Sequence, residues 1–134
     1  MNLLCQVFQY DLNTSNYAID LSKSKSFALT AYTDASWAAD KMDRKSISGY
    51  VIFLEDVPVT WSTTKQKCTG LSNMEAEYIA LLEAVKEIVW LNIRQNGCVF
   101  LELPIMKSEI FSDKQSAICY LKKNDYLLIT IIYK

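Results

Sequence analysis

The sequence predicts an α/β protein in which a mixed sheet is covered by helices. Three β-rich segments separated by short turns predict an antiparallel three-stranded meander. A long helical pattern follows them, and another β-rich segment comes after that helix. This last strand must return to the sheet by a crossover, so we expect it to lie parallel to a neighbouring strand.

The meander occupies the first half of the chain. Its first strand ends at Asp34, and a polar loop over Trp37–Lys45 follows it. Glu55-Asp56 separates the second and third strands and is typical of a hairpin turn. The three strands are assigned to residues 27–33, 49–54 and 57–62. A further strand is expected earlier in the chain, at Tyr17–Leu21.

The clearest element is a helix from about Asn73 to Gln95. Ser72 is a suitable N-cap, and Glu75 three residues later completes a capping box. Small and apolar residues then recur at every third or fourth position, which forms one helix face that can approach a sheet closely. This face consists of Ala76, Ala80, Ala84, Ile88 and Leu91.

The last third of the chain supplies the remaining elements. Ile105–Phe111 is the expected parallel strand, and Lys114–Lys123 is expected to be a second helix. Leu127–Tyr133 is apolar and β-branched, but the sequence does not show what it packs against. We therefore divide the chain into an N-terminal segment (residues 1–26), a domain (residues 27–124) and a divergent tail (residues 125–134).

Composition restricts the chemistry that the chain can perform. Its 134 residues are 51% apolar with a net charge of −1, which indicates one globular domain without a strongly basic arm. The chain has no His, so Ser-His-Asp and Cys-His nucleophiles and His metal sites are excluded. Its three glycines are too far apart for a Gly-rich phosphate loop. Carboxylates with a bound metal are therefore the expected carriers of any catalysis.

The cysteines and the N-terminus indicate the cellular environment. Cys5, Cys68, Cys98 and Cys119 include no CxxC pair, which argues against a zinc site, and we expect reduced, mostly buried thiols. Residues 1–10 lack the basic start of a signal peptide. No apolar run reaches the roughly 18 residues that a membrane span needs. We therefore expect an intracellular protein that does not cross a membrane.

Three carboxylates lie at the ends of predicted elements. Asp34 ends the first strand, Glu77 lies in the first turns of the long helix, and Asp113 follows the last strand. Each also has an ordinary structural explanation: a turn residue for Asp34, a charge favoured by the helix dipole for Glu77, and an N-cap for Asp113. Spacing alone does not decide between these explanations and a metal site.

Five blocks occur in a fixed order along the chain: Tyr32–Ala38, Asp43–Tyr50, Trp61–Gln66, Glu75–Leu81 and Ser112–Ile118. In order and spacing they resemble the ribonuclease H domain of Ty1/copia-type retrotransposon polyproteins, the retrovirus-related Pol polyproteins. Residues 7–26 loosely resemble the segment that joins reverse transcriptase to this domain. We therefore interpret residues 1–26 as a remnant of that segment, and the resemblance implies ancestral fusion to reverse transcriptase and integrase.

The resemblance also implies an activity. Family members cut the RNA strand of RNA–DNA hybrids with two Mg²⁺ ions held by four acidic residues, and Mn²⁺ is an alternative ion. Asp34, Glu77 and Asp113 match the first three acids, as catalytic and metal-binding residues. Glu77 is preferred to Glu75 because a small residue, Ala80, follows it at plus three. The implied fold is the ribonuclease H-like mixed sheet.

Contacts with the hybrid are implied at several polar positions. Gln115, Ser72, Asn73 and Ser36 match or adjoin positions where related enzymes touch nucleic acid, although cap and turn polarity explains these four residues equally well. A hybrid-binding face would combine Trp37 and Trp61 with nearby basic residues. The alternative is a solvated rim with core tryptophans. The basic residues are Arg44, Lys45, Lys65, Lys67, Lys122 and Lys123.

Two departures from the family argue against full activity. Lys114 stands where the family has Asn, and its side chain either weakens metal binding or points away. The fourth acid is not matched, because Asp125 does not align with it and the chain has no His-rich block. We therefore expect a decayed, C-terminally truncated copy that cleaves weakly or not at all. The alternatives are a non-catalytic relic that binds nucleic acid and a remnant that does not fold stably.

Overall fold

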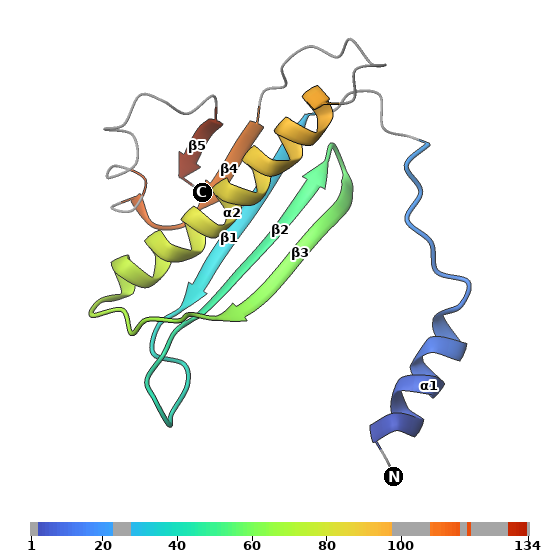
Figure 1. Cartoon of the computed structure of the whole chain (residues 1–134), viewed down its shortest axis with the longest axis horizontal. Coiled ribbons are helices and arrows are strands. Elements are labelled where there is room, and N and C mark those ends of the chain that lie inside the picture. The colour runs from blue at the N-terminus through green and yellow to red at the C-terminus, as the bar shows by residue number, and fades with distance from the viewer. Residues whose placement is uncertain (1–2, 23–27, 98–107, 116–117, 119–128, 134) are drawn as a thin grey trace.

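The computed structural model describes residues 3–22, 28–97, 108–115, 118 and 129–133. The strands form one five-stranded sheet in the order β3-β2-β1-β4-β5, with the helix α2 lying across one face (Figure 1). In chain order the elements are α1 (Leu3–Thr14), β1 (Leu29–Ser36), β2 (Ile47–Leu54), β3 (Val57–Lys65), α2 (Asn73–Gly97), β4 (Ser108–Ser112) and β5 (Ile129–Tyr133).

The topology confirms the predicted mixed sheet. β1, β2 and β3 pair antiparallel, and Leu54 pairs with Val57 across the turn at Glu55-Asp56. β4 pairs parallel with β1 after the α2 crossover. The apolar tail contributes β5, which pairs parallel with β4. The strand partner of this tail was not evident from the sequence, because strand pairing is a long-range contact.

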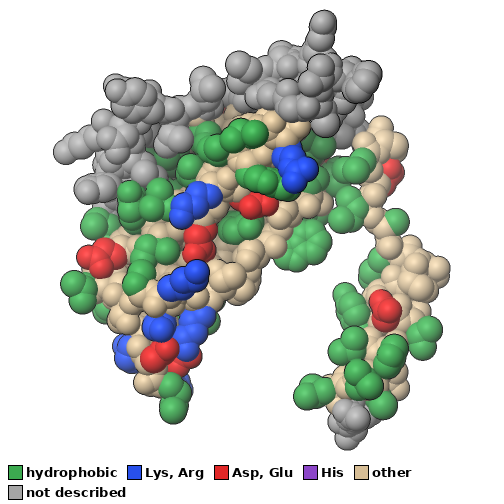
Figure 2. All heavy atoms as spheres, in the orientation of Figure 1, with side chains coloured by type: hydrophobic (Ala, Val, Ile, Leu, Met, Phe, Trp, Pro, Cys, Tyr) green, Lys and Arg blue, Asp and Glu red, His purple; other side chains and the backbone are tan. Residues whose placement is uncertain are grey.

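The N-terminal region differs from the prediction. A helix, α1, lies where none was expected, and residues 17–21 form no strand. None of the α1 residues is buried, and Figure 2 shows apolar side chains over its surface. Residues 17–21 have strand-forming composition, but a strand also needs a partner for its backbone groups, and none pairs with them in the described sheet.

Other expectations have mixed outcomes. Cys5 and Cys68 are exposed, so the expectation of mostly buried thiols is wrong for them, because α1 buries nothing and Cys68 lies in the loop after β3. Cys98, Cys119 and most of the helix expected at Lys114–Lys123 lie outside the described residues. The division at residues 26 and 124 remains a prediction. Within the described ranges, no helix has the length and apolarity to cross a membrane.

The predicted helix is confirmed as α2, and its small-residue face packs on the sheet. Ala76, Ala80, Ala84 and Ile88 are completely buried, and α2 contacts β1, β2 and β4. Two of these residues, Ala76 and Ala80, form a small cluster with Ala35 of β1. Because alanine side chains are short, the helix axis lies close to the strand at this point. The main core lies further along α2, around Leu81, Val85 and Ile88.

The first turn of α2 is capped nearly as expected. The backbone N–H of Glu75 donates to Ser72 Oγ at 3.2 Å, as an N-cap requires. The Glu75 carboxylate accepts a hydrogen bond from the Leu71 backbone N–H at 2.7 Å, one residue before the capping residue. These two bonds fix the residue at which the helix begins and therefore the position of Glu77 in its first turns.

The alanine contact generates a stability prediction. Ala80→Leu adds a side chain at a position with no exposed surface, opposite Ala35, so helix and strand must separate. Overpacking of this kind typically costs about 1–3 kcal/mol. We expect urea denaturation to show a loss in this range. The control is Val89→Leu. Val89 lies on α2 with 37% of its surface exposed, so this variant should change stability by less than about 0.5 kcal/mol. Equal stability of the two variants would contradict the close packing.

Candidate active site

Three carboxylates from three elements converge at one end of the sheet. Asp34, Glu77 and Asp113 each offer one oxygen, and these oxygens all lie within 4.8 Å of one another. Glu77 is buried, with 2% of its surface exposed, whereas Asp34 and Asp113 are exposed. The expected proximity of the three groups is therefore observed. Their catalytic role remains a prediction.

The register of the sheet accounts for this convergence. In the parallel pair, Tyr32 of β1 is aligned with Phe111 of β4. Two residues further on, Asp34 lies within β1 and Asp113 directly follows the end of β4, so both lie at the same end of the sheet. The N-terminus of α2 lies at this same end (Figure 1), and the Ala35–Ala76–Ala80 cluster holds Glu77 over β1. The three groups are far apart in sequence and meet only through this topology.

The environment of Glu77 favours its neutral form. Burial, and then repulsion from Asp113 and Asp34, raises the pKa of Glu77 from 4.5 to about 7. Attraction to Lys114 and a hydrogen bond from the Ala35 backbone act in the opposite direction. Burial is the largest cause of the raised pKa of Glu77, and repulsion between the carboxylates comes second.

Lys114 points toward the cluster. Its Nζ lies 3.1 Å from Asp113 Oδ2, and this contact raises the pKa of Lys114. Of the two orientations that the sequence leaves open, the structure shows the one in which the ammonium neutralises part of the carboxylate charge. A cation approaching Asp113 must therefore compete with this ammonium group.

The donor set is suited to a divalent cation. Glu77 Oε2 is buried and has no hydrogen-bond partner, which is costly for a carboxylate oxygen unless a ligand supplies the missing contact. Three convergent carboxylates are the ligand type that Mg²⁺ prefers. The residues present therefore fit a divalent metal ion, which Asp34, Glu77 and Asp113 would hold.

The other predicted contact residues lie on the same elements but have different surroundings. Ser36 is exposed at the end of β1, and Asn73 and Gln115 are also exposed. Ser72 is half-buried, and its Oγ is used in capping α2. The ordinary structural explanation is thus observed for Ser72. Contact of all four residues with nucleic acid remains a prediction.

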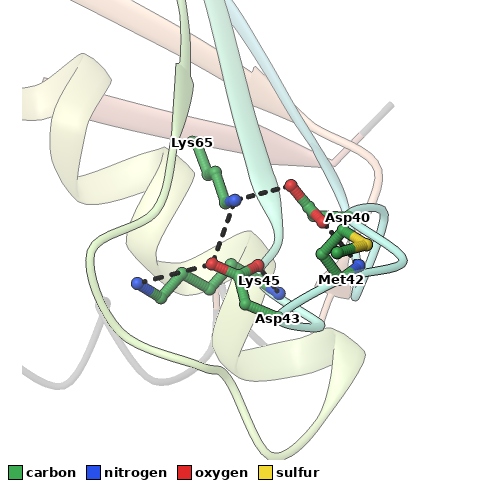
Figure 3. Close-up of polar contacts among 5 residues, drawn as sticks. All are labelled: Asp40, Met42, Asp43, Lys45 and Lys65. Carbon is green, nitrogen blue, oxygen red and sulfur yellow. Dashed lines mark hydrogen bonds and ion pairs between the residues drawn. The ribbon is translucent and has the colours of Figure 1, made fainter.

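Lys45 of the polar loop and Lys65 at the end of β3 are paired with acids of that loop. Lys65 Nζ lies 2.5 Å from Asp40 Oδ2 and 2.9 Å from Asp43 Oδ2, which joins the end of β3 to the loop (Figure 3). Lys65 lowers the pKa of Asp40 and of Asp43. Lys45 lies 3.7 Å from the same Asp43 oxygen. Figure 2 shows acidic and basic side chains intermixed here, so this loop carries little net positive charge.

The two tryptophans near these lysines are not core residues. Trp61 is 63% exposed, and Trp37 is 47% exposed with its Nε1 donating to Gly70 O at 3.0 Å. The alternative that placed them in the core is therefore wrong. Both residues lie at the surface, and the spacing of apolar residues in the sequence does not distinguish a buried face of a strand from an exposed one. Lys122 and Lys123 lie outside the described residues.

A buried polar network near the site is not evident from the sequence. Gln66, Ser46 and Ser48 are all buried, and Gln66 Nε2 donates to Ser48 Oγ at 2.8 Å and to Ala76 O at 2.9 Å. Only Ser48 lies within a strand, so the alternation of polar and apolar residues does not mark the network. The network reaches the residue before Glu77 through the bond to Ala76 O.

Similar proteins are found among retrotransposon polyproteins. The chain is 37% identical over 91 residues to the retrovirus-related Pol polyprotein from transposon RE1 of Arabidopsis thaliana. It is 41% identical over 101 residues to the corresponding polyprotein from transposon TNT 1-94 of Nicotiana tabacum. These matches cover 68% and 73% of the chain but only 6% and 7% of the polyproteins.

A shorter protein is similar over the same length. The chain is 40% identical over 91 residues to secreted RxLR effector protein 161 of Plasmopara viticola, a match that covers 68% of the chain and 64% of that protein. The matched part is thus less than two thirds of each of these relatives. No family model matches the chain.

Solved structures share the fold. A ribonuclease H1 isolated from compost by metagenomics superimposes with a TM-score of 0.55 and 15% identity, covering 81% of this chain and 84% of that one. Ribonuclease H1 from Halobacterium salinarum gives a TM-score of 0.51 and 17% identity, covering 80% and 86%. At such low identity these likenesses show the fold alone.

The raised pKa of Glu77 predicts a pH-dependent stability. Below pH 4.5 the group is protonated in both states, and between about pH 4.5 and 7 the folded state keeps a proton that the unfolded state releases. Wild-type stability should therefore fall as pH rises through this window, by about 3 kcal/mol in total. Glu77→Gln cannot titrate, so its stability relative to wild type should increase from pH 4 to pH 8. Urea denaturation with a chelator checks this, and a constant difference would contradict it.

The Lys114 contact predicts that removing this cation strengthens metal binding. Lys114→Ala frees Asp113 Oδ2, so affinity for Mg²⁺ or Mn²⁺ should rise about two- to fivefold, the effect of a typical exposed ion pair. Isothermal titration calorimetry measures this. Lys86→Ala, which removes an equal charge nine residues beyond Glu77 on α2, is the control and should change affinity little. Unchanged affinity in Lys114→Ala would show that the ammonium does not compete.

Proposed function

We propose that this chain, a ribonuclease H-like domain homologous to the Pol polyproteins of copia-type retrotransposons, cuts the RNA strand of RNA–DNA hybrids by metal-dependent hydrolysis. The candidate active site consists of Asp34, Glu77 and Asp113. The substrate class follows from the homology and from the ribonuclease H1 enzymes that share the fold.

The observation that carries this proposal is the convergence of three carboxylates around a buried, unpartnered oxygen of Glu77. Ordinary cap and turn roles for the three residues would not require their oxygens to lie within 4.8 Å of one another. Placing like charges together costs free energy, which a bound cation would recover. This cost supports a role of the three carboxylates in cation binding.

The residues of the chain would contribute as metal ligands. Divalent ions bound here would activate a water molecule and stabilise the leaving oxygen of a phosphodiester. Asp34 and Asp113, which are exposed, and Glu77, which is buried, would hold these ions. Glu77 can act as a ligand only when ionised, and its pKa of about 7 means that metal binding should strengthen as pH rises through neutrality.

A non-catalytic role in nucleic-acid binding is the second candidate. Lys114 beside Asp113 favours it, because the ammonium weakens metal affinity while attracting phosphate. Within the described residues, the cluster also contains three carboxylates where the family uses four. The groove of about 520 Å³ between β3 and α2 does not strengthen this candidate, because three lysines and two glutamates line it.

Cleavage of a labelled RNA–DNA duplex distinguishes the two functions. We expect slow cleavage with Mg²⁺, faster cleavage with Mn²⁺, and none in Asp34→Asn, which removes a charged ligand. Lys114→Asn should cut faster than wild type because Asp113 is then free. Duplex binding without any cleavage in either metal, in wild type and Lys114→Asn alike, would favour the non-catalytic role. Cleavage that persists in Asp34→Asn would exclude the proposed site.

A further inference from the structure

Gln66 lies at the centre of a buried network that joins the sheet to α2. Its side chain is 2% exposed, and its Nε2 donates to Ser48 Oγ at 2.8 Å and to Ala76 O at 2.9 Å. Its backbone N–H donates to Ser46 O at 2.8 Å. The backbone carbonyl of Ala76 can only accept, so the amide nitrogen of Gln66 must face it. One side chain thus connects β2 to the first turn of α2.

The two groups that accept hydrogen bonds from the Gln66 side chain belong to residues that neighbour the carboxylate cluster, in sequence or across the sheet. Ala76 directly precedes Glu77. Ser48 pairs with Ala35 across β2 and β1, and the backbone of Ala35 donates a hydrogen bond to the Glu77 carboxylate. Asp34 is the residue before Ala35. A change in the distance between β2 and α2 would therefore alter the contact between Glu77 and β1, both through Ala76 and through Ser48.

We propose that Gln66 is a positioning residue that holds the Glu77 carboxylate at the distance from Asp34 needed to share a divalent cation. This inference rests on the proposed function, since it concerns the same metal site. Gln66 does not touch the site itself and acts through Ala76 and Ser48.

The unpaired atom of Gln66 argues that its role goes beyond stability. Gln66 Oε1 is buried and has no hydrogen-bond partner. A buried polar atom without a partner offsets much of what the other two hydrogen bonds contribute to folding. An unbranched apolar residue of similar length would fill the space without this cost. The distinct property of glutamine here is the fixed geometry between Ser48 and Ala76.

The test compares Gln66→Met with wild type in the whole chain. Met keeps the length of the side chain and removes both amide atoms. We expect affinity for Mn²⁺, measured by calorimetry, to fall about tenfold, the lower end of the effect of residues that orient metal ligands. We also expect the Ala35 amide signal in a ¹H–¹⁵N NMR spectrum of the metal-free protein to shift, because its bond to Glu77 changes.

Two further variants separate positioning from stability. Ile88→Val removes one methylene from a fully buried position of the same helix, in the main core. It should lower stability and leave both the Mn²⁺ affinity and the Ala35 signal unchanged. Ser48→Ala removes one partner of Gln66 and should reproduce the shift and the loss of affinity to a smaller degree. If Gln66→Met does not fold, Ser48→Ala decides the question.

The outcomes also distinguish this inference from the proposed function. If wild type binds Mn²⁺ and neither Gln66→Met nor Ser48→Ala changes affinity or the Ala35 signal, the positioning role is overturned and the metal site stands. If wild type binds no Mn²⁺ but the Ala35 signal shifts in both variants, Gln66 positions Glu77 and the proposed function fails. A shift of the signal without loss of affinity overturns the role in metal binding.

Discussion

The contact of alanine with alanine between α2 and β1 is the constraint on which the rest of the structure depends. Ala76 and Ala80 on the helix and Ala35 on the strand leave no room for larger side chains, and all three are buried. Their small size brings the helix close enough for Glu77 to reach the level of Asp34 and Asp113. The parallel pairing of β1 with β4 then aligns the two aspartates. The site is thus a consequence of backbone proximity, and the core around Leu81 and Ile88 maintains it.

That proximity creates an electrostatic conflict which the chain resolves only in part. Burial and two neighbouring carboxylates raise the pKa of Glu77 to about 7, so Glu77 is only partly ionised near neutral pH when no metal is bound. Lys114 supplies a compensating charge at Asp113. Both features relieve repulsion without a metal ion, and both reduce the attraction for one. The carboxylate cluster therefore combines a geometry that fits a divalent cation with an electrostatic balance that weakens cation binding.

Several errors of the sequence interpretation share one physical origin. The strand expected at Tyr17–Leu21 has the right composition but no partner in the described sheet, while the tail at Ile129–Tyr133 acquires one from β4. Strand formation depends on distant backbone groups, and local patterns do not contain that information. Trp61, which one alternative placed in the core, is 63% exposed on β3.

The resemblance of short motifs to a known family singled out the three acids as candidates. The sequence by itself determined the order of the elements of the sheet and α2, the capped start of α2 and its small-residue face. These are properties of local periodicity and of residue types at fixed spacing. Only the tertiary structure decided that the three carboxylates meet, that burial dominates the pKa of Glu77, that Lys114 turns toward Asp113, and that Gln66 joins β2 to α2. The meeting of the carboxylates, the burial of Glu77 and the Gln66 network depend on the distance between elements that are remote in the chain, and Lys114 adopts its orientation beside that cluster. Such distances are set by the packing of whole helices and strands and have no counterpart in neighbouring residues.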